Sequence, residues 1–291
     1  MKSFEYIRPV SLNEACRLLG TRNSSNYILA GGTDLLVRIK KDDILPERVI
    51  SLRDIPNLSE VRTDSNGLFI GAMTTFSTIV GHRGIMRSFP AIAEAAQQIG
   101  SAQVRNRATI GGNLCNGAPS ADMVPALLVH GASLVITSEN KDRTMPLQDF
   151  FKGPGQTHLE TGEILKEIYL PISQPCFSTY LKAYRSKMDI ALVGVGLFLG
   201  FKPGRRNCSK IRIALGAVAP TPLLLNNLEE IISGSGLDDI TIDKIVHYVS
   251  GQASPITDVR TTASYRYELI RVLTQRALLA ARKSYNQGVS E

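Results

Sequence analysis

The chain reads Ile28-Leu29-Ala30-Gly31-Gly32-Thr33-Asp34-Leu35-Leu36 at one glycine loop and Ala108-Thr109-Ile110-Gly111-Gly112-Asn113-Leu114-Cys115-Asn116-Gly117 at a second. Each loop follows a segment that can form a strand and leads into one that can form a helix. Paired glycines permit a positive φ, and successive amides in such a turn form a nest for anions. A following helix adds unpaired N–H groups. One loop alone is equally explained by a tight turn at a helix cap, but two predict a cradle for a pyrophosphate.

The composition is that of a globular protein with one large domain or two medium ones. The chain has 291 residues, of which 43% are hydrophobic, so it can bury a sizeable core. Its net charge of +7 is spread along the sequence. Scattered solubilising charge and a basic docking face for an acidic partner both stay open, whereas nucleic-acid binding is not expected. Arg266, Arg271, Arg276 and Arg282 on the last helix are candidates for such a face.

The four cysteines do not form a metal or iron–sulfur motif within this chain. They are Cys16, Cys115, Cys176 and Cys208, and no two have the spacing of a C-x-x-C pair. Cys16 is expected to be a small buried residue rather than a reactive thiol. The N-terminus lacks an apolar signal core, and no stretch approaches about 18 apolar residues. We therefore expect a cytoplasmic protein with no disulfides and no membrane contact.

The pattern of predicted strands and helices changes near the middle of the chain. Up to residue 171, short strands at 27–30, 48–52, 68–72, 133–137 and 163–171 are separated by helices, and Ser11 with Glu14 has the spacing of a capping box. Residues 171–175, which begin and end with proline, are the best domain boundary. Beyond them, strands at 189–199 and 210–219 precede helices, the last at 264–283. Strands followed by helices predict an α+β fold.

No side chains form a recognisable catalytic group. The histidines His82, His130, His158 and His247 lack a partnering serine or cysteine, so we expect each to be a surface or packing residue. The glycine spacing is neither that of a Rossmann fingerprint nor that of a P-loop. A nucleotide cradle without catalytic or metal-binding side chains indicates a redox cofactor carrier, because the cofactor then holds the reactive atom.

Several segments in combination resemble the FAD-binding medium subunit of the molybdenum hydroxylases, the group of xanthine dehydrogenases, carbon monoxide dehydrogenases and their relatives. They are 30–36, 108–113 with Asp122, 182–191, 216–222 and Tyr265-Arg266. The resemblance covers essentially the whole chain. Within the group, residues 112–117 and 188–191 are most similar to the separate flavin subunit of bacterial xanthine dehydrogenases.

The resemblance implies a PCMH or vanillyl-alcohol-oxidase-type FAD-binding fold. Residues 1–172 would form the FAD-binding domain, as two α+β subdomains at roughly 1–55 and 56–172. Residues 176–284 would form a C-terminal α+β domain of the CO dehydrogenase flavoprotein type, which closes over the isoalloxazine.

The resemblance also assigns cofactor-binding residues. Residues 29–36 would wrap the pyrophosphate through backbone amides, and 108–113 would form a second phosphate wall. Asp122 would bind towards the ribose and adenine half, Leu165 would contact the adenine half, and Lys182 would reach the flavin end. From the residues alone, Asp122 is also explained by a helix first turn and Lys182 by a solvated strand end. The full set is Leu29, Ala30, Gly31, Gly32, Thr33, Asp34, Leu35, Leu36, Ala108, Thr109, Ile110, Gly111, Gly112, Asn113, Asp122, Leu165 and Lys182.

The implied function is electron transfer through FAD to NAD in a molybdenum hydroxylase, with xanthine and purine metabolism as the favoured assignment. FAD would be non-covalent, because neither glycine loop contains a histidine. The iron–sulfur clusters and the molybdenum cofactor would belong to two partner subunits, in two copies of a three-subunit unit. The alternatives are the flavin subunit of a carbon monoxide, nicotinate or aromatic-CoA dehydrogenase, a stand-alone flavin oxidase or reductase, and a non-catalytic nucleotide-binding protein.

Overall fold

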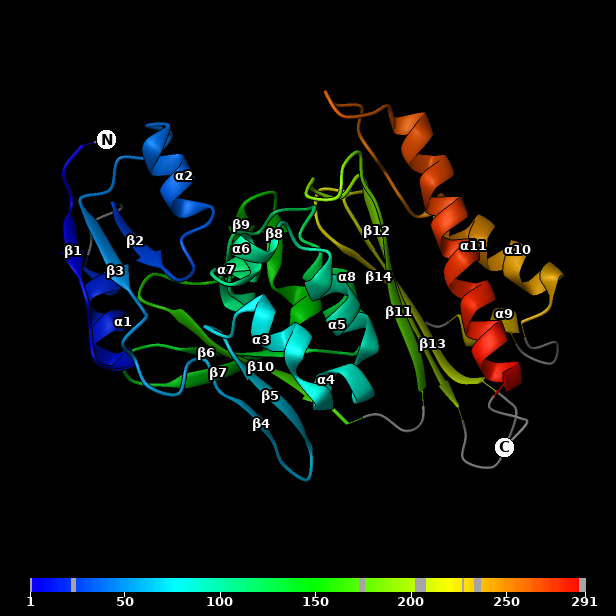
Figure 1. Ribbon diagram of the computed structural model, residues 1–291, viewed down its shortest axis with the longest axis horizontal. Coiled ribbons are helices and arrows are strands. Elements are labelled where there is room, and N and C mark those ends of the chain that lie inside the picture. The colour runs from blue at the N-terminus through cyan, green and yellow to red at the C-terminus, as the bar shows by residue number, and fades with distance from the viewer. Residues whose placement is uncertain are drawn as a thin grey trace.

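A three-stranded parallel sheet forms the N-terminal part of the computed structural model, at the left of Figure 1. Its central strand β3 (Arg48–Ser51) pairs with β1 (Glu5–Ile7) and β2 (Asn26–Leu29). Helix α1 (Leu12–Gly20) connects β1 to β2, and α2 (Leu35–Lys40) connects β2 to β3. The structure describes residues 2–21, 25–172, 176–201, 208–226, 228–232 and 237–287, so residues 173–175 of the expected boundary lie outside the described residues.

Helix α1 begins at the predicted cap. The Ser11 hydroxyl accepts a hydrogen bond from the Glu14 amide at 3.2 Å. The Glu14 carboxylate accepts from the Val10 amide at 3.0 Å, one residue earlier than in a full capping box. Cys16 on the inner face of α1 is buried, as expected, and burial raises the pKa of its thiol to about 11. It therefore packs as a small neutral residue.

A five-stranded antiparallel sheet follows, in the order β4-β5-β10-β6-β7. A β-bulge between Leu165 and Glu167 interrupts the pairing of β10 with β6. A small hairpin, β8 (Phe151–Gly153) with β9 (Gln156–Thr157), follows a short 3-10 helix at Leu147–Asp149. The strands of the large sheet are β4 (Val61–Thr63), β5 (Gly67–Gly71), β6 (Ser133–Thr137), β7 (Asp142–Pro146) and β10 (Ile164–Pro171).

Helices in the middle of the molecule share one hydrophobic core with this sheet (Figure 1). Thr75 caps the first of them by accepting a hydrogen bond from the Thr78 amide. The last, α8, is buried at all seven positions. These helices are α3 (Phe76–Gly81), α4 (Arg83–Ser88), α5 (Pro90–Gln97), α6 (Ala102–Arg105), α7 (Ile110–Cys115) and α8 (Met123–Val129).

His130 directly follows α8 and is a packing residue, as expected. Its ring lies edge-on between Phe89 and Phe198, with centroid distances of 5.1 and 5.4 Å. Its Nε2 lies 3.0 Å from the Ser178 hydroxyl. Burial lowers the pKa of His130 to about 3, so the ring is neutral at physiological pH.

A four-stranded antiparallel sheet forms the C-terminal part, in the order β11-β12-β13-β14. Its strands are β11 (Cys176–Ala183), β12 (Val193–Phe201), β13 (Cys208–Gly216) and β14 (Leu223–Leu225). Helices α5 and α8 contact one face, and α11 covers the other, with α10 packed against it (Figure 1). The helices beyond this sheet are α9 (Glu229–Ile232), α10 (Asp239–Gly251) and α11 (Ala263–Gln287).

The α+β class expected from the sequence is confirmed, although the ends of several elements differ from those expected. The strand predicted from residue 189 begins at Val193, because Asp189 instead pairs with Arg185 in the loop before it. Within the described ranges, no helix is long and apolar enough to cross a membrane.

Candidate functional site

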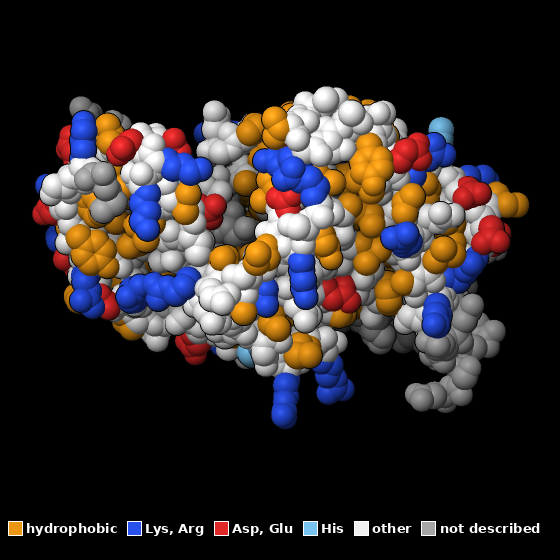
Figure 2. All heavy atoms as spheres, turned by 45° about the horizontal axis from the view of Figure 1, so that its top comes forward, with side chains coloured by type: hydrophobic (Ala, Val, Ile, Leu, Met, Phe, Trp, Pro, Cys, Tyr) orange, Lys and Arg blue, Asp and Glu red, His pale blue; other side chains and the backbone are white. Residues whose placement is uncertain are grey.

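A cavity of about 770 Å³ lies between the N-terminal sheet, the two glycine loops and the start of β10. Figure 2 shows the surface hollowed between the N-terminal lobe and the middle of the molecule. Ligand pockets typically enclose roughly 300–1,000 Å³. The predicted residues that line it are Ala30, Gly31, Gly32, Thr33, Asp34, Leu35, Ala108, Thr109, Gly111, Gly112, Asn113, Asp122 and Leu165.

The first glycine loop joins β2 to α2, as predicted, and its amides are unpaired. In the described parts of the chain, the amides of residues 31–34 donate to no other group. Gly32 has φ +79°, a conformation that favours glycine. The Asp34 side chain makes no capping hydrogen bond to α2. This loop therefore presents a row of free donors to the cavity, as an anion nest does.

Gly31 brings the two loops into contact. A Cβ atom placed at this residue would lie 2.2 Å from the Arg107 carbonyl oxygen and 2.8 Å from the Ala108 Cα. Both neighbours are backbone atoms and cannot rotate away. Only glycine at position 31 therefore allows the first loop to pack directly against the segment that leads into the second loop.

The second glycine loop differs from the prediction. It follows α6 rather than a strand, and its glycines lie inside α7. The Ile110 amide donates to the Thr74 carbonyl, and the Gly111 amide to the Ala72 carbonyl. The Thr109 hydroxyl caps α7 by accepting from the Gly112 amide at 3.2 Å. Because these amides are already bonded, this loop can offer a ligand its side chains but not an amide nest.

Two buried amide oxygens on the cavity wall lack a hydrogen-bond donor in the described structure. They are Oδ1 of Asn113, a predicted residue, and Oδ1 of Asn26 at the start of β2. The Asn26 amide nitrogen donates to the Leu18 carbonyl at 3.1 Å, which turns the oxygen away from α1. Unpaired buried polar atoms are costly, so a ligand that donates hydrogen bonds suits this wall.

Asp122 and Lys182 form a buried ion pair. Lys182 Nζ lies 2.8 Å from one carboxylate oxygen of Asp122, and the Tyr180 hydroxyl donates to the other at 2.7 Å. The Asp122 and Lys182 side chains are only 9% and 1% exposed. Burial raises the pKa of Asp122, whereas Lys182 and the Tyr180 hydroxyl oppose that rise. The two side chains are in direct contact, and Asp122 is the member of the pair that lines the cavity.

Two other carboxylates on the wall are also paired with a cation. Glu163 accepts two hydrogen bonds from the Arg143 guanidinium, at 2.6 and 2.7 Å. Asp189 lies 2.7 Å from Arg185. These arginines hold the pKa of each carboxyl below its usual value. The negative charge facing a bound anion is therefore smaller than the number of acidic residues suggests.

Four predicted site residues do not line the cavity. Leu29 packs in the small core beneath the N-terminal sheet, and Ile110 lies in the main core. Leu36 is 38% exposed on α2. Lys182 lies behind Asp122. Neighbouring positions in a strand or helix point in different directions, which a contiguous motif does not reveal.

The structure adds wall residues that the sequence did not assign. Arg38 lies one helical turn beyond Asp34 on α2, and this i, i+4 spacing was a usable signal. Residues 188–190 reach the same cavity from the loop between β11 and β12. They belonged to a recognised motif, but nothing in their composition predicted a place in the wall of this cavity.

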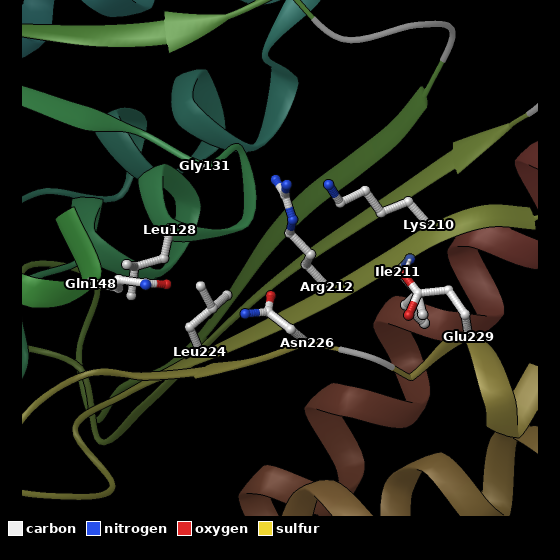
Figure 3. Close-up of a pocket in the computed structure, with 9 residues that line it drawn as sticks. All are labelled: Leu128, Gly131, Gln148, Lys210, Ile211, Arg212, Leu224, Asn226 and Glu229. Carbon is white, nitrogen blue, oxygen red and sulfur yellow. Dashed lines mark hydrogen bonds between the residues drawn. The ribbon is translucent and has the colours of Figure 1, made fainter. Parts of the chain in front are cut away.

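A smaller cavity of about 290 Å³ lies where α8 meets β13 (Figure 3). Arg212 and Lys210 extend side by side from β13, with Glu229 beyond them. Arg212 donates to the Val129 carbonyl at 2.9 Å, so it binds the C-terminal end of α8, where a cation is favourable. The Glu229 carboxylate accepts from the Ile211 amide at 3.1 Å. This cluster is accounted for by the junction between helix and sheet.

The structure argues against a continuous basic docking face on α11, one of the two alternatives that the sequence leaves open. Arg266 is 3% exposed, and its guanidinium lies inside the molecule. Arg282 pairs with Asp239 at 2.6 Å. Arg271 and Arg276 are exposed. The arginines of α11 therefore do not form one continuous basic surface.

Two family models match the chain across almost its whole length. Residues 2–173 match the FAD binding domain in molybdopterin dehydrogenase. Residues 178–281 match the CO dehydrogenase flavoprotein C-terminal domain.

Characterised relatives cover the chain nearly end to end. The xanthine dehydrogenase FAD-binding subunit of Escherichia coli O157:H7 is 34% identical, covering 95% of this chain and 95% of that protein. The glyceraldehyde dehydrogenase medium chain of Sulfolobus acidocaldarius is 32% identical, covering 94% and 96%. The carbon monoxide dehydrogenase medium chain of Afipia carboxidovorans is 32% identical, covering 96% and 97%.

Solved structures share the fold. A chain of the CO dehydrogenase from Oligotropha carboxidovorans superimposes with a TM-score of 0.91 at 32% identity, covering 97% of this chain and 98% of that one. A chain of quinoline 2-oxidoreductase from Pseudomonas putida 86 gives 0.90 at 28% identity, covering 98% and 99%. The expected FAD-binding fold with its C-terminal α+β part is confirmed.

Proposed function

Because this chain belongs to the family of FAD-binding subunits of molybdenum hydroxylases, we propose that it passes electrons from iron–sulfur clusters through non-covalent FAD to NAD. The chain is an oxidoreductase subunit of this family. The clusters and the molybdenum cofactor belong, in this proposal, to two partner subunits. The observation that carries the FAD site is the row of unpaired amides at residues 31–34, which open on a cavity of about 770 Å³.

The residues of the cavity fit FAD on three counts. The free amides suit the pyrophosphate, because a nest of N–H groups binds anions without a buried counter-charge. The unpaired amide oxygens of Asn26 and Asn113 suit hydroxyl donors of the ribityl chain or ribose. Apolar side chains such as Ile28, Phe76 and Leu165 offer surface to the rings.

The chain's part in the reaction is to hold and insulate the cofactor. Bound FAD would supply the redox chemistry, since it accepts and donates one or two electrons. The amides of 31–34 bind it, and Asp122 and Asn113 orient it. Lys182 donates a hydrogen bond to Asp122 and so fixes the position of that carboxylate on the wall. The loop at 188–190 excludes water from the opposite side.

We assign the remaining details as parts of the same proposal. The cofactor contacts are the predicted residues that line the cavity, with Lys182 acting through Asp122. Residues 1–172 and 176–284 form the two domains, and the protein works in the cytoplasm. Xanthine is the favoured substrate of the whole enzyme. Relatives named for carbon monoxide, glyceraldehyde or nicotinate are 31–33% identical, so their substrates are the competing assignments.

The first test is an absorption spectrum of the purified chain before and after acid precipitation. A flavin spectrum that moves completely to the supernatant and chromatographs as FAD supports the site and its non-covalent binding. A colourless protein that also fails to take up added FAD refutes it. Colour that stays in the pellet refutes the non-covalent assignment.

The second test addresses partners and substrate. The tagged chain is purified from its own host, and its partners are tested for molybdenum and for iron–sulfur absorption. The complex is then assayed with xanthine, carbon monoxide, nicotinate and glyceraldehyde, with NAD as the acceptor. Xanthine-dependent formation of NADH supports the assignment, whereas turnover of another substrate alone overturns it. Turnover of a substrate by this chain without partners favours a stand-alone flavin enzyme.

A further inference from the structure

Arg266 is a buried arginine that joins three segments of the C-terminal part. Its Nη1 donates to the Leu192 carbonyl at 2.6 Å and to the Ala217 carbonyl at 3.0 Å. Its Nη2 lies 3.0 Å from the Asp258 carboxylate, and the arginine side chain is 4% exposed. Its Nε donates to no described group. The two carbonyls and Asp258 therefore determine where this guanidinium lies.

One carbonyl belongs to a loop that lines the cofactor cavity, and the other belongs to a turn that is hydrogen-bonded to a segment lining it. Leu192 ends the loop between β11 and β12, and its amide donates to the Ala183 carbonyl at 2.8 Å, which closes the neck of that loop. Residues 188–190 of this loop line the cavity. Ala217 has φ +64°, and its amide donates to the Pro119 carbonyl at 2.8 Å. Pro119 stands between Ala118 and Ser120, which both line the cavity.

Asp258 supplies a counter-charge for Arg266 throughout the physiological pH range. Asp258 accepts hydrogen bonds from the amides of Arg260 and Thr261, and these bonds, with the Arg266 guanidinium, lower the pKa of Asp258 to about 2. A buried guanidinium needs such a partner, because an unpaired buried charge is strongly unfavourable. Its planar fork can hold two carbonyls and a carboxylate at once, which a lysine ammonium cannot match in direction.

We propose that Arg266 is a positioning residue for the cofactor cavity. It fixes the loop at 184–192 and the turn at Ala217, and through them the part of the wall that the C-terminal sheet contributes. The inference deepens the proposed function and rests on it in one respect, namely that FAD occupies this cavity. Arg266 itself is too far inside the C-terminal part to be counted among the residues that line the cavity.

The test compares Arg266→Gln and Arg266→Lys with Arg271→Gln, an exposed arginine of the same helix. The first readout is hydrogen exchange in FAD-free protein, resolved for peptides covering 184–192 and 215–219. The second is the FAD dissociation constant of the complete chain. Asp258→Asn, which removes the counter-charge, serves as a second variant if Arg266→Gln does not fold.

We expect Arg266→Gln to speed exchange at 184–192 and at Ala217 by at least about tenfold, since hydrogen bonds to a charged donor are lost there. Exchange in α10 should not change. FAD affinity should fall about tenfold in Arg266→Gln and by a smaller factor in Arg266→Lys. It should stay at the wild-type value in Arg271→Gln. Uniformly faster exchange throughout the chain shows a merely structural role and overturns the inference, as does unchanged exchange at 184–192.

The two proposals fail in different ways. If the wild type does not bind FAD, the proposed function is refuted, and local exchange at 184–192 still decides whether Arg266 fixes this wall. If the wild type binds FAD and Arg266→Gln binds it equally well, the positioning role is refuted and the proposed function stands.

Discussion

The two glycine loops look alike in sequence and differ in what they offer a ligand. At the first loop, residues 31–34 keep their amides free. At the second, Thr109 caps a helix that already contains both glycines, so the corresponding amides are bonded within the protein. A glycine pair after an apolar run therefore indicates a close backbone approach, but only the hydrogen-bond pattern shows whether the donors are available.

This difference divides the cavity wall by chemistry. One side works through backbone N–H groups, and the other works through side chains such as Asn113 and Asp122. Substitutions that preserve the backbone should matter little on the first side and more on the second. The following experiments test that division, beginning with the change expected to have the largest effect.

Replacing Gly31 with alanine should separate the loops. The new Cβ would lie 2.2 Å from the Arg107 carbonyl oxygen, whereas a Cβ at Gly112 would meet the Thr109 hydroxyl at 3.0 Å. We expect Gly31→Ala to weaken FAD binding by about 100-fold or more, and Gly112→Ala to change it by less than about fivefold. Isothermal titration with FAD measures both. Gly81→Ala is the control, because its Cβ would meet nothing within 4 Å. Equal losses at Gly31 and Gly112 would contradict the division.

Replacing Tyr180 with phenylalanine should show how much its hydrogen bond to Asp122 contributes to stability. The Asp122 carboxylate would lose a hydrogen bond of 2.7 Å, at a cost of about 1.5–3 kcal/mol in the free energy of unfolding. Urea unfolding measures this, with the exposed Tyr248→Phe as the control.

The stability of the Tyr180→Phe variant should also depend on pH, in a direction that follows from the pKa of Asp122. Burial raises the pKa of Asp122 above the 3.8 of an unfolded chain, so its contribution to stability is present at low pH and is lost as the pH rises through the folded pKa. The Tyr180 hydrogen bond lowers that pKa. Tyr180→Phe should raise it further and extend the loss to higher pH, and Asp122→Asn should abolish this dependence. Identical pH slopes in all three proteins would show that Asp122 does not titrate as described.

Single side chains on the two loops should respond differently to truncation. Asn113→Ala removes an amide whose oxygen is unpaired at the cavity, so FAD affinity should fall about tenfold, equivalent to about 1.4 kcal/mol. Thr33→Ala keeps the backbone nest and should leave affinity within about twofold. Fluorescence quenching of added FAD provides the measurement. A larger loss at Thr33 than at Asn113 would reverse the assignment of the two sides.

The smallest difference is expected between the residues that precede α7 and α2, namely Thr109 and Asp34. Thr109→Ala removes the hydroxyl that accepts from the Gly112 amide and should lower the free energy of unfolding by about 1 kcal/mol. Asp34→Ala should change it little, because the Asp34 side chain makes no capping bond. Thermal unfolding without FAD separates the two. A loss of about 1 kcal/mol in Asp34→Ala would contradict this, because it would show that the Asp34 side chain stabilises the start of α2.

Much of the architecture followed from local pattern. Periodicity and the spacing of Ser11 and Glu14 located α1, and apolar runs located β5, β6 and β10 of the large sheet, because burial and helix caps act over a few neighbouring residues. Prolines and glycines marked where elements end. The strand at 189–199 was placed too early, because an apolar run does not reveal that Asp189 is held in a loop by Arg185.

The site was only partly predictable, for a physical reason. A motif gives the residues near a ligand, but it does not give the direction of each side chain, and so Leu29, Leu36 and Ile110 were assigned to a wall that they do not line. The pairing of Asp122 with Lys182 joins positions 60 residues apart and depends on how α8 meets β11. The sequence did not identify Asn26 as a wall residue, because it does not show that the Asn26 Oδ1 atom is buried without a hydrogen-bond donor.

Helix α8 has a consequence for how this protein unfolds and how it can be divided. All seven of its residues are buried, and it packs against β12 and β13 of the C-terminal sheet although it belongs to the sequence before residue 172. A fragment that ends at 172 would expose this apolar helix to water, and one that begins at 176 would expose the sheet face beneath it. The two halves should therefore unfold in one cooperative transition, and each alone should aggregate.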